Sequence, residues 1–190
     1  MKILVVGGIG YIGSHMLKRF KETNYDIEIL DNLSSGQKDN TQNYKLHVCD
    51  LSDKETVYKI LSEQNYDLVM HFAASINVEE SYNDPKKYQQ NNVINTINLL
   101  DCMKDLKINK FIFSSSAAVY GEPKHLPVTE LHPFNPVNPY GDTKAEVENT
   151  LKNYEESCDL KYVSLRYFNA CGAHLDGTIG EMPVSYTHLT

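Results

Sequence analysis

The sequence lacks most features of secreted, membrane-spanning or metal-binding proteins. Its four cysteines are scattered without a Cys-x-x-Cys pair, at Cys49, Cys102, Cys158 and Cys171. This spacing predicts neither a metal site nor a disulfide framework. The first apolar run breaks at glycines after five residues, whereas a membrane span needs about 20 residues and a signal peptide needs a cleavage site. We therefore expect reduced thiols, a cytoplasmic location and no membrane partner.

Clustered positive charge is also missing. The net charge is −7, and no basic run of five or more residues occurs, which argues against a nucleic-acid partner because such binding depends on grouped Lys and Arg. The absence of a Gly-x-Ser-x-Gly segment disfavours a nucleophilic-serine hydrolase. With 41% hydrophobic and 23% charged residues, the composition is that of an ordinary globular protein with one substantial core.

Short apolar runs alternate with helical patterns along the chain. Strands are expected at 2–6, 27–30, 45–48, 67–72, 110–116 and 161–168, and helices near 11–22, 53–64, 85–106 and 139–157. The strand runs are mostly continuous, as in strands covered on both faces. The alternation predicts an α/β fold with a doubly wound parallel sheet, Rossmann-like, and right-handed crossovers.

A glycine-rich turn, "VVGGIGYIGSH", follows the first expected strand and opens a helix. Gly7 would permit a tight turn, Gly10 would let a pyrophosphate approach the main chain, and Gly13 would let the helix pack closely on the strand. The amide groups and dipole of the helix N-terminus favour anionic phosphates. Glycines are common in such turns, but this position in a strand–turn–helix unit favours dinucleotide binding.

An acidic residue closes the second expected strand. Asp31 lies 18 residues after Gly13, near the spacing of an acid that binds a ribose diol. It would repel a 2′-phosphate, which favours NAD over NADP. The alternative is an aspartate that only shapes the turn before "NLSSG".

The pattern Tyr-x-x-x-Lys occurs three times, at Tyr82…Lys86, Tyr120…Lys124 and Tyr140…Lys144. Proline, with or without glycine, interrupts the first two, so neither pair is expected to share a helical face. The third pair follows Asn138 as a helix cap and Pro139 as the first helical residue. It begins an inward-facing stripe at positions 140, 144, 147, 151, 154 and 158, in which Lys144 is the one cation.

This placement suggests acid–base chemistry. A nearby ammonium group would lower the tyrosine pKa from about 10, so that Tyr140 could act as a general base toward a substrate hydroxyl. Three serines end the strand run "FIFSSS", at the edge where open parallel sheets bind ligands. Serine-rich strand ends also occur without any function.

The sequence resembles the extended short-chain dehydrogenase/reductase family and, within it, the sugar-nucleotide 4-epimerases. The resemblance rests on motifs in order: "GGIGYIGSH", "DNLSSG", "HFAA", "NNV", "FIFSSSAAVYG", "NPYGDTK" and "LRYFNACGAH". It covers about residues 2–181, nearly all of this chain but only the amino-terminal part of the family's length.

The resemblance implies a role for each matching residue. Contacts with NAD would come from Gly7, Gly10, Tyr11, Ile12 and Gly13 at the pyrophosphate, from Asp31, Asn32, Ser35 and Gly36 at the adenosine ribose, from Asp50 and Leu51 at the adenine, from Phe72, Ala73, Ala74 and Asn91 along the dinucleotide, and from Phe168 at the nicotinamide. Tyr140 would be the catalytic base, Lys144 its partner bound to the cofactor ribose, and Ser116 the proton relay. Ser116, Tyr140 and Asn169 would contact the UDP-hexose substrate.

The implied reaction interconverts UDP-galactose and UDP-glucose by transient oxidation at sugar C4, as in galactose metabolism. Other UDP-sugar 4-epimerases, acting on UDP-glucuronate or an N-acetylhexosamine, stay open, as does a truncated non-catalytic NAD-binding module. A 4,6-dehydratase is disfavoured because Ala117 and Ala118 stand where that reaction needs acids. Ala118 and Ile9 replace a usual threonine and alanine, and Ile76 replaces a lysine that some members direct toward the cofactor.

The resemblance also implies a domain division. Residues 1–175 would form the NAD-binding domain, and 176–190 would be the stub of a carboxyl-terminal substrate domain that is largely missing. The tail from about 182, "MPVSYTHLT", departs from the family and resembles non-native sequence, so this fragment could be inactive. A homodimer would form through the helices expected at 85–106 and 139–157.

Overall fold

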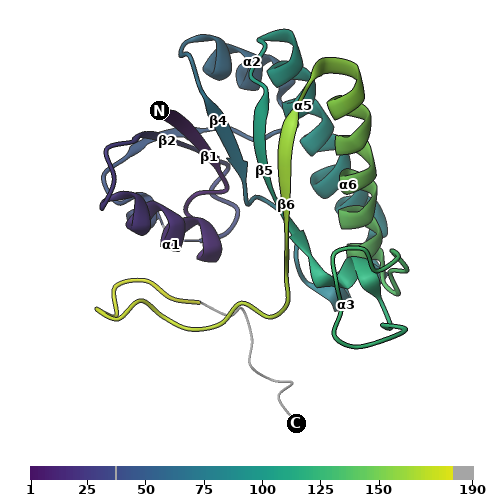
Figure 1. The fold of residues 1–190 in the computed structure, drawn as a ribbon. Helices are drawn as coiled ribbons and strands as arrows, with labels where there is room; N and C mark the ends of the chain where they lie inside the picture. Colours follow the sequence, from purple (N-terminus) through teal and green to yellow (C-terminus); the bar gives the residue numbers. More distant parts are fainter. Residues whose placement is uncertain (37, 182–190) are drawn as a thin grey trace.

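The computed structural model describes residues 1–36 and 38–181, so the expected non-native tail lies outside the described residues. In this part of the chain, six parallel strands form one sheet in the order β3-β2-β1-β4-β5-β6. The strands are β1 (Lys2–Val6), β2 (Asp26–Asp31), β3 (Lys45–Val48), β4 (Leu68–His71), β5 (Lys110–Ser116) and β6 (Lys161–Tyr167). All six expected strands are present, and the predicted doubly wound, Rossmann-like sheet is confirmed (Figure 1).

Helices connect the strands. They are α1 (Tyr11–Phe20), α2 (Lys54–Ser62), α3 (Val78–Asn83), α4 (Pro85–Tyr88), α5 (Asn95–Asp105) and α6 (Pro139–Cys158), with 3-10 turns η1 (Lys38–Thr41) and η3 (Ala117–Tyr120) and a π-helical turn η2 (Gln89–Ile94). The four expected helical segments are therefore confirmed in outline. The expectation of one regular helix over 85–106 is wrong, because the π-helical turn η2 interrupts the α-helical geometry between α4 and α5.

Helix α3 was not expected from the sequence. The Asn77 side chain caps it by accepting a hydrogen bond of 3.0 Å from the amide of Glu80, and Glu79 and Glu80 place negative charge in its first turn. Both features stabilise a helix N-terminus. The helix is only six residues long, too short for an apolar period to stand out in the sequence.

The two faces of the sheet are covered unequally. Helices α2, α5 and α6 pack on one face over the larger hydrophobic core, and α1 packs on the other face over β1 and β2. Figure 1 shows this division. On the α1 face, the edge strand β6 leaves Val163 54% exposed. The strands nearest α1 are thus buried on both sides, which explains their continuous apolar sequence.

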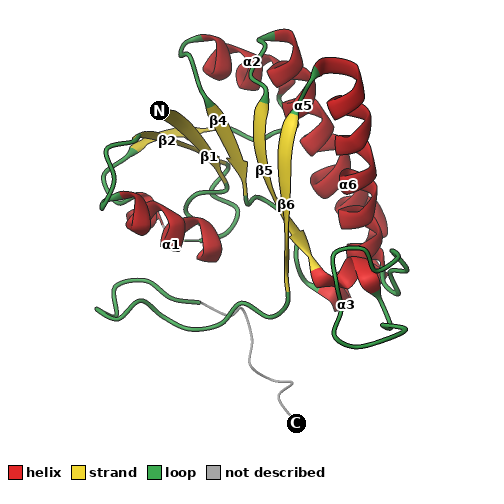
Figure 2. Ribbon diagram, in the orientation of Figure 1, coloured by secondary structure: helices red, strands yellow, loops and turns green. Residues whose placement is uncertain are grey.

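The segment after β6 crosses the carboxyl edge of the sheet toward α1 (Figure 2). The Tyr11 hydroxyl donates a hydrogen bond of 2.8 Å to the Gly172 carbonyl, and Lys18 forms an ion pair with Asp176. A bridge between Ala173 and Gly180 closes the segment into a turn. The domain boundary expected at 175 falls inside this turn and stays a prediction. Among the described residues, no helix is both long and apolar enough to span a membrane.

Candidate active site at the carboxyl edge of the sheet

The glycine turn after β1 has the geometry that its sequence predicts. Gly7 has φ +74°, and a Cβ there would lie 2.4 Å from the amide nitrogen of Ala73. A Cβ at Gly13 would lie 2.3 Å from the Gly7 carbonyl oxygen, so α1 packs directly on the turn. A Cβ at Gly10 would meet only that oxygen, at an ordinary 3.5 Å. Gly10 therefore leaves space at the α1 N-terminus, where an anion would be favoured.

Asp31 joins the end of β2 to the glycine turn. Its carboxylate accepts hydrogen bonds from the amides of Ile9 (3.2 Å) and Leu33 (2.9 Å). The side chain is buried, and burial raises its pKa while these backbone bonds oppose the rise. Gly36 returns the loop against the main chain of Ile9. Asp31 thus shapes the turn, and each carboxylate oxygen keeps capacity for a further donor.

The residues expected at the adenine side lie next to this loop. The Asn32 amide donates a hydrogen bond of 2.6 Å to Asp50, and Asp50 also accepts from the amide of Ser52 at 2.8 Å. Leu51 is buried, and Ser35 is exposed. The structure therefore brings the ends of β2 and β3 together at one rim of the site.

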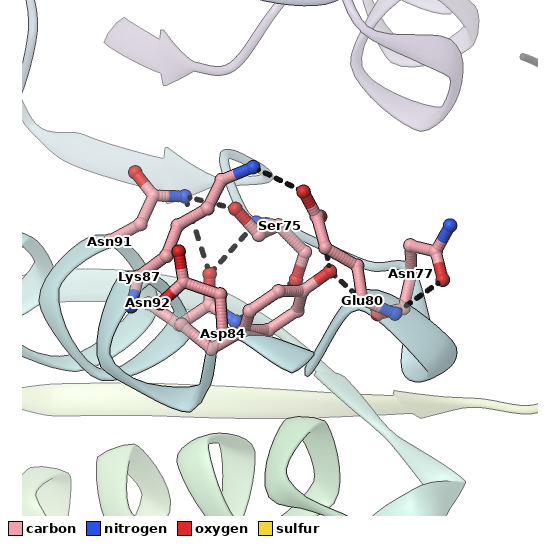
Figure 3. A network of polar contacts seen from close by, with 8 residues as sticks. Ser75, Asn77, Glu80, Asp84, Lys87, Asn91 and Asn92 are labelled. Atoms are coloured by element: carbon pink, nitrogen blue, oxygen red, sulfur yellow. Dashed lines mark hydrogen bonds and ion pairs between the residues drawn. The ribbon is translucent and has the colours of Figure 1, made fainter. Parts of the chain in front are cut away.

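The loop after β4 is held by a polar network that centres on Asn92 (Figure 3). The Asn92 side chain accepts from the Ser75 amide at 2.8 Å and donates to the Ser75 carbonyl at 3.0 Å. It also donates to the Thr143 hydroxyl on α6 at 3.2 Å. Asn91 donates to the Ser75 hydroxyl at 3.0 Å. The π-helical turn η2 thus connects the β4 exit loop to the helix that carries Lys144.

The sequence predicts a site role for Asn91 and none for Asn92. Both belong to the quoted motif "NNV", but Asn92 is buried and makes the larger number of contacts. Both residues lie in the π-helical turn and both contact Ser75, and π turns of this kind are frequent at functional sites. The regular helical spacing used to read a sequence gives no signal for such a π turn.

Three residues from two elements meet at the end of β5. The Ser116 side chain lies close enough to Tyr140 to influence its pKa, and it accepts a hydrogen bond of 3.1 Å from the amide of Ala118. The Lys144 ammonium lies 5.8 Å from the centre of the Tyr140 ring and donates to the Ser114 carbonyl at 2.9 Å. The rival pairs do not share a helix, since Tyr82 and Lys86 lie in α3 and α4 and Lys124 follows η3.

The expected lowering of the Tyr140 pKa by Lys144 is wrong. Burial raises the pKa of Tyr140, and the nearby Ser116 side chain opposes that rise without reversing it. Burial also lowers the pKa of Lys144 to about 7, so the ammonium carries only part of its charge at neutral pH. Packing around both groups, rather than their spacing in the sequence, sets these values.

His71 lies close to this group, and its position in the sequence predicts no role for it. It is 1% exposed, and its Nε2 is 3.0 Å from the Thr96 hydroxyl. That hydroxyl donates to the Asn92 carbonyl at 2.7 Å, so His71 is the donor to Thr96. Burial and the nearby Lys144 lower the His71 pKa to about 3. His71 is therefore neutral at physiological pH and adds no second cation.

The remaining expected site residues lie along the same edge. Phe72 and Ala74 are half-buried in the β4 exit loop, and Ile12 is half-buried in the first turn of α1. Phe168 and Asn169 follow β6 directly and are exposed, Phe168 to 75%. The structure places these two at the carboxyl end of the sheet, beside the segment that reaches Tyr11.

The glycine turn, the acid at the end of β2 and the Ser-Tyr-Lys group define a dinucleotide-binding protein of the short-chain dehydrogenase/reductase type. Comparison with known proteins narrows this class. The chain belongs to the NAD dependent epimerase/dehydratase family, whose model matches residues 3–184.

Several characterised proteins are similar to the chain. A UDP-glucose 4-epimerase from Lactobacillus helveticus is 45% identical over 190 residues, which are 100% of this chain and 58% of that protein. The crystal structure of UDP-glucose 4-epimerase from Brucella ovis in complex with NAD has a TM-score of 0.93 at 42% identity, over 95% of this chain and 56% of that one. The UDP-Glc/GlcNAc 4-epimerase from Campylobacter jejuni has a TM-score of 0.87 at 43% identity, over 97% and 58% of the two chains. The chain thus spans between half and two thirds of the length of these relatives.

Proposed function

We propose that this chain supplies the cofactor-binding and proton-transferring part of an NAD-dependent UDP-sugar 4-epimerase, with UDP-galactose and UDP-glucose as its substrates. The observation that carries the proposal is the Ser116–Tyr140–Lys144 group at the same sheet edge as the glycine turn. Relatives named UDP-glucose 4-epimerase support the substrate. In this proposal the reaction belongs to galactose metabolism in the cytoplasm. The homodimer expected to form through residues 85–106 and 139–157 stays a prediction.

The residues present fit NAD. The open face of Gly10 and the α1 N-terminus would take the pyrophosphate. The buried Asp31 would accept hydrogen bonds from hydroxyls of the adenosine ribose, with Asn32, Ser35 and Gly36 beside it. When bound, NAD would accept a hydride from the sugar C4 and return it to the other face.

The chain's own residues would handle the proton. Tyr140 would take it from the sugar 4-hydroxyl, and Ser116 would hydrogen-bond to the phenolate and relay the proton. Ribose hydroxyls beside Lys144 would give its Nζ acceptors in addition to the Ser114 carbonyl. More acceptors would stabilise the ammonium and raise its pKa. The positive charge would then lower the Tyr140 pKa toward the range in which the phenol works as a base.

A UDP-N-acetylhexosamine 4-epimerase is the second candidate. The Campylobacter jejuni relative, named for both UDP-Glc and GlcNAc 4-epimerase activity, favours it at 43% identity. The two candidates share the catalytic group and differ in the pocket around the sugar C2 substituent. A non-catalytic NAD-binding module is the third and would share only the cofactor contacts.

The first experiment releases and quantifies nucleotide from the purified chain, and then measures conversion of UDP-galactose and UDP-N-acetylgalactosamine. We expect NAD in nearly stoichiometric amount. We also expect Tyr140→Phe to retain NAD and lose at least about 100-fold of any turnover, since general-base catalysis contributes about that much or more. A folded chain that binds no NAD would contradict the proposal. Bound NAD with activity unaffected by Tyr140→Phe would contradict the catalytic roles.

A further inference from the structure

A buried carboxylate on α6 lies on the same helix face as Tyr140 and Lys144, the proposed catalytic pair. Glu148 lies four residues after Lys144 and eight after Tyr140, and residues spaced by four stack on one side of a helix. Its side chain is 3% exposed. A charge this far from water needs partners, because desolvation of an isolated carboxylate is costly.

The partners of Glu148 come from two adjacent strands at the same level. The Ser115 hydroxyl donates to Glu148 Oε1 at 2.5 Å. The Arg166 guanidinium donates from Nε at 2.9 Å and from Nη2 at 2.7 Å. Ser115 and Arg166 are register partners in β5 and β6. One carboxylate therefore holds α6 to both strands at a single point.

This contact point lies between the two residues of β5 that serve the catalytic pair. The carbonyl of Ser114 accepts the hydrogen bond from Lys144, and the side chain of Ser116 lies beside Tyr140 and lowers its pKa. Ser115 is the single residue between Ser114 and Ser116. A displacement of Ser115 relative to Glu148 would change both of these contacts.

The other end of Arg166 holds the segment that leads into α6. Its Nη1 donates to the Tyr120 hydroxyl at 2.7 Å and to the Glu130 carbonyl at 3.0 Å. The guanidinium carbon lies 4.8 Å from the centre of the Phe134 ring. Arg166 thus connects η3 and the 121–138 loop to the same carboxylate. Both segments adjoin catalytic residues, because η3 follows Ser116 and the loop ends at the Asn138 cap.

We propose that Glu148 and Arg166 are positioning residues that set the separation between Ser116 on β5 and Tyr140 on α6. In this role they act through Ser115 and the 121–138 loop, which they contact directly. The proposal rests on the catalytic roles assigned above to Ser116 and Tyr140. Buried ion pairs contribute little net stability, because desolvation offsets much of their attraction. A geometric role therefore explains this pair better than a stabilising one.

The test reads the Tyr140 phenol directly and needs neither NAD nor substrate. A fluorinated tyrosine at position 140 gives a single ¹⁹F NMR signal, and its phenol titrates closer to neutral pH than tyrosine does. Ser116→Ala in this background defines the shift in the Tyr140 pKa caused by complete loss of the Ser116 side chain's influence. Ser115→Ala removes only the link from β5 to Glu148. The double variant Glu148→Ala with Arg166→Met removes the ion pair without leaving a buried unpaired charge.

We expect Ser115→Ala and the double variant to raise the apparent pKa of the probe by at least about half of the Ser116→Ala shift. Glu146→Ala, on the exposed side of the same helix, is the matched control and should cause no shift. If both test variants titrate like Glu146→Ala, the positioning role is wrong. If the double variant does not fold, Ser115→Ala alone decides between these outcomes. Because the readout requires no cofactor, absence of NAD binding would count against the proposed function and not against this measurement.

Discussion

The ammonium of Lys144 donates a hydrogen bond of 2.9 Å to the main-chain carbonyl of Ser114. Among the described residues, that carbonyl is the acceptor found for a group with three N–H donors. The side chain is 3% exposed, and burial lowers its pKa to about 7. Lys144 is thus held in the core at an energetic cost that a ligand with hydroxyl groups would relieve.

Lys144→Met should stabilise the chain stripped of nucleotide while it weakens NAD binding. The folded pKa of about 7 lies below the reference value of 10.5, so protonation opposes folding, and the cost is complete below pH 7. It shrinks as the pH rises from 7 toward 10.5. Denaturant unfolding should therefore show a larger gain in the free energy of unfolding at pH 6 than at pH 9. The exposed Lys59→Met is the control, and an equal gain at both pH values would contradict the burial argument.

Gly13→Ala and Gly10→Ala should separate folding from ligand binding. The new Cβ at position 13 would lie 2.3 Å from the Gly7 carbonyl oxygen, and overpacking of this kind costs about 1–3 kcal/mol. At position 10 the same atom meets only an ordinary contact of 3.5 Å. We expect Gly13→Ala to lower the melting temperature, and Gly10→Ala to keep it but lose NAD. A Gly10→Ala chain that retains full NAD would show that the pyrophosphate does not approach there.

Asn92→Ala should mainly reduce stability, whereas Asn91→Ala should mainly reduce NAD binding. Asn92→Ala leaves the half-buried Ser75 main-chain groups and the buried Thr143 hydroxyl without their Asn92 partner, at a cost of about 2–4 kcal/mol for several unmade hydrogen bonds. Asn91 is half-buried, with its amide on the Ser75 hydroxyl, so its loss should cost less than about 1 kcal/mol. Urea unfolding measures the first effect. The same unfolding experiment measures the smaller cost of Asn91→Ala, and NAD affinity should fall in that variant because Asn91 is expected to line the dinucleotide.

Glu28→Gln should destabilise the chain at pH 7 and much less near pH 2. Burial raises the pKa of Glu28, but hydrogen bonds from His47, Lys2 and Tyr66 outweigh it and bring the pKa to about 2. The stabilisation by Glu28 is therefore complete above the reference value of 4.5 and fades as the pH falls from there to 2. Unfolding at pH 7 and pH 3 measures this loss. The exposed Glu55→Gln should have a small effect that does not follow this pH dependence.

Much of the fold could be predicted because its signals are local. Apolar runs marked the six strands, and Asn138 and Pro139 marked the start of α6, where Asn138 does accept a bond from the Gly141 amide at 2.7 Å. Helix α3 and the π turn η2 escaped prediction. The first is too short to show a period, and the second departs from the regular helical spacing on which such reading depends.

The sequence predicts which residues form the candidate site but not the contacts that hold them in place. Tyr140, Lys144 and Ser116 do come together, because the carboxyl ends of parallel strands and the starts of the following helices meet at one edge. Their binding and catalytic roles stay proposals. The contacts that hold them were not visible, since Glu148 and Arg166 lie 18 residues apart and Asn92 and Thr143 lie 51 apart in sequence.

The sequence by itself determined the order of strands and helices, the tight turn at Gly7 and the choice of one Tyr-Lys pair among three. Each depends on residues close together in the chain, through backbone sterics, capping and the period of apolar side chains. Only the tertiary structure decided that Lys144 has a pKa of about 7, that the Tyr140 pKa is raised, and that Glu148 joins α6 to two strands. Burial and charge spacing set these properties, and both arise where segments distant in sequence pack together.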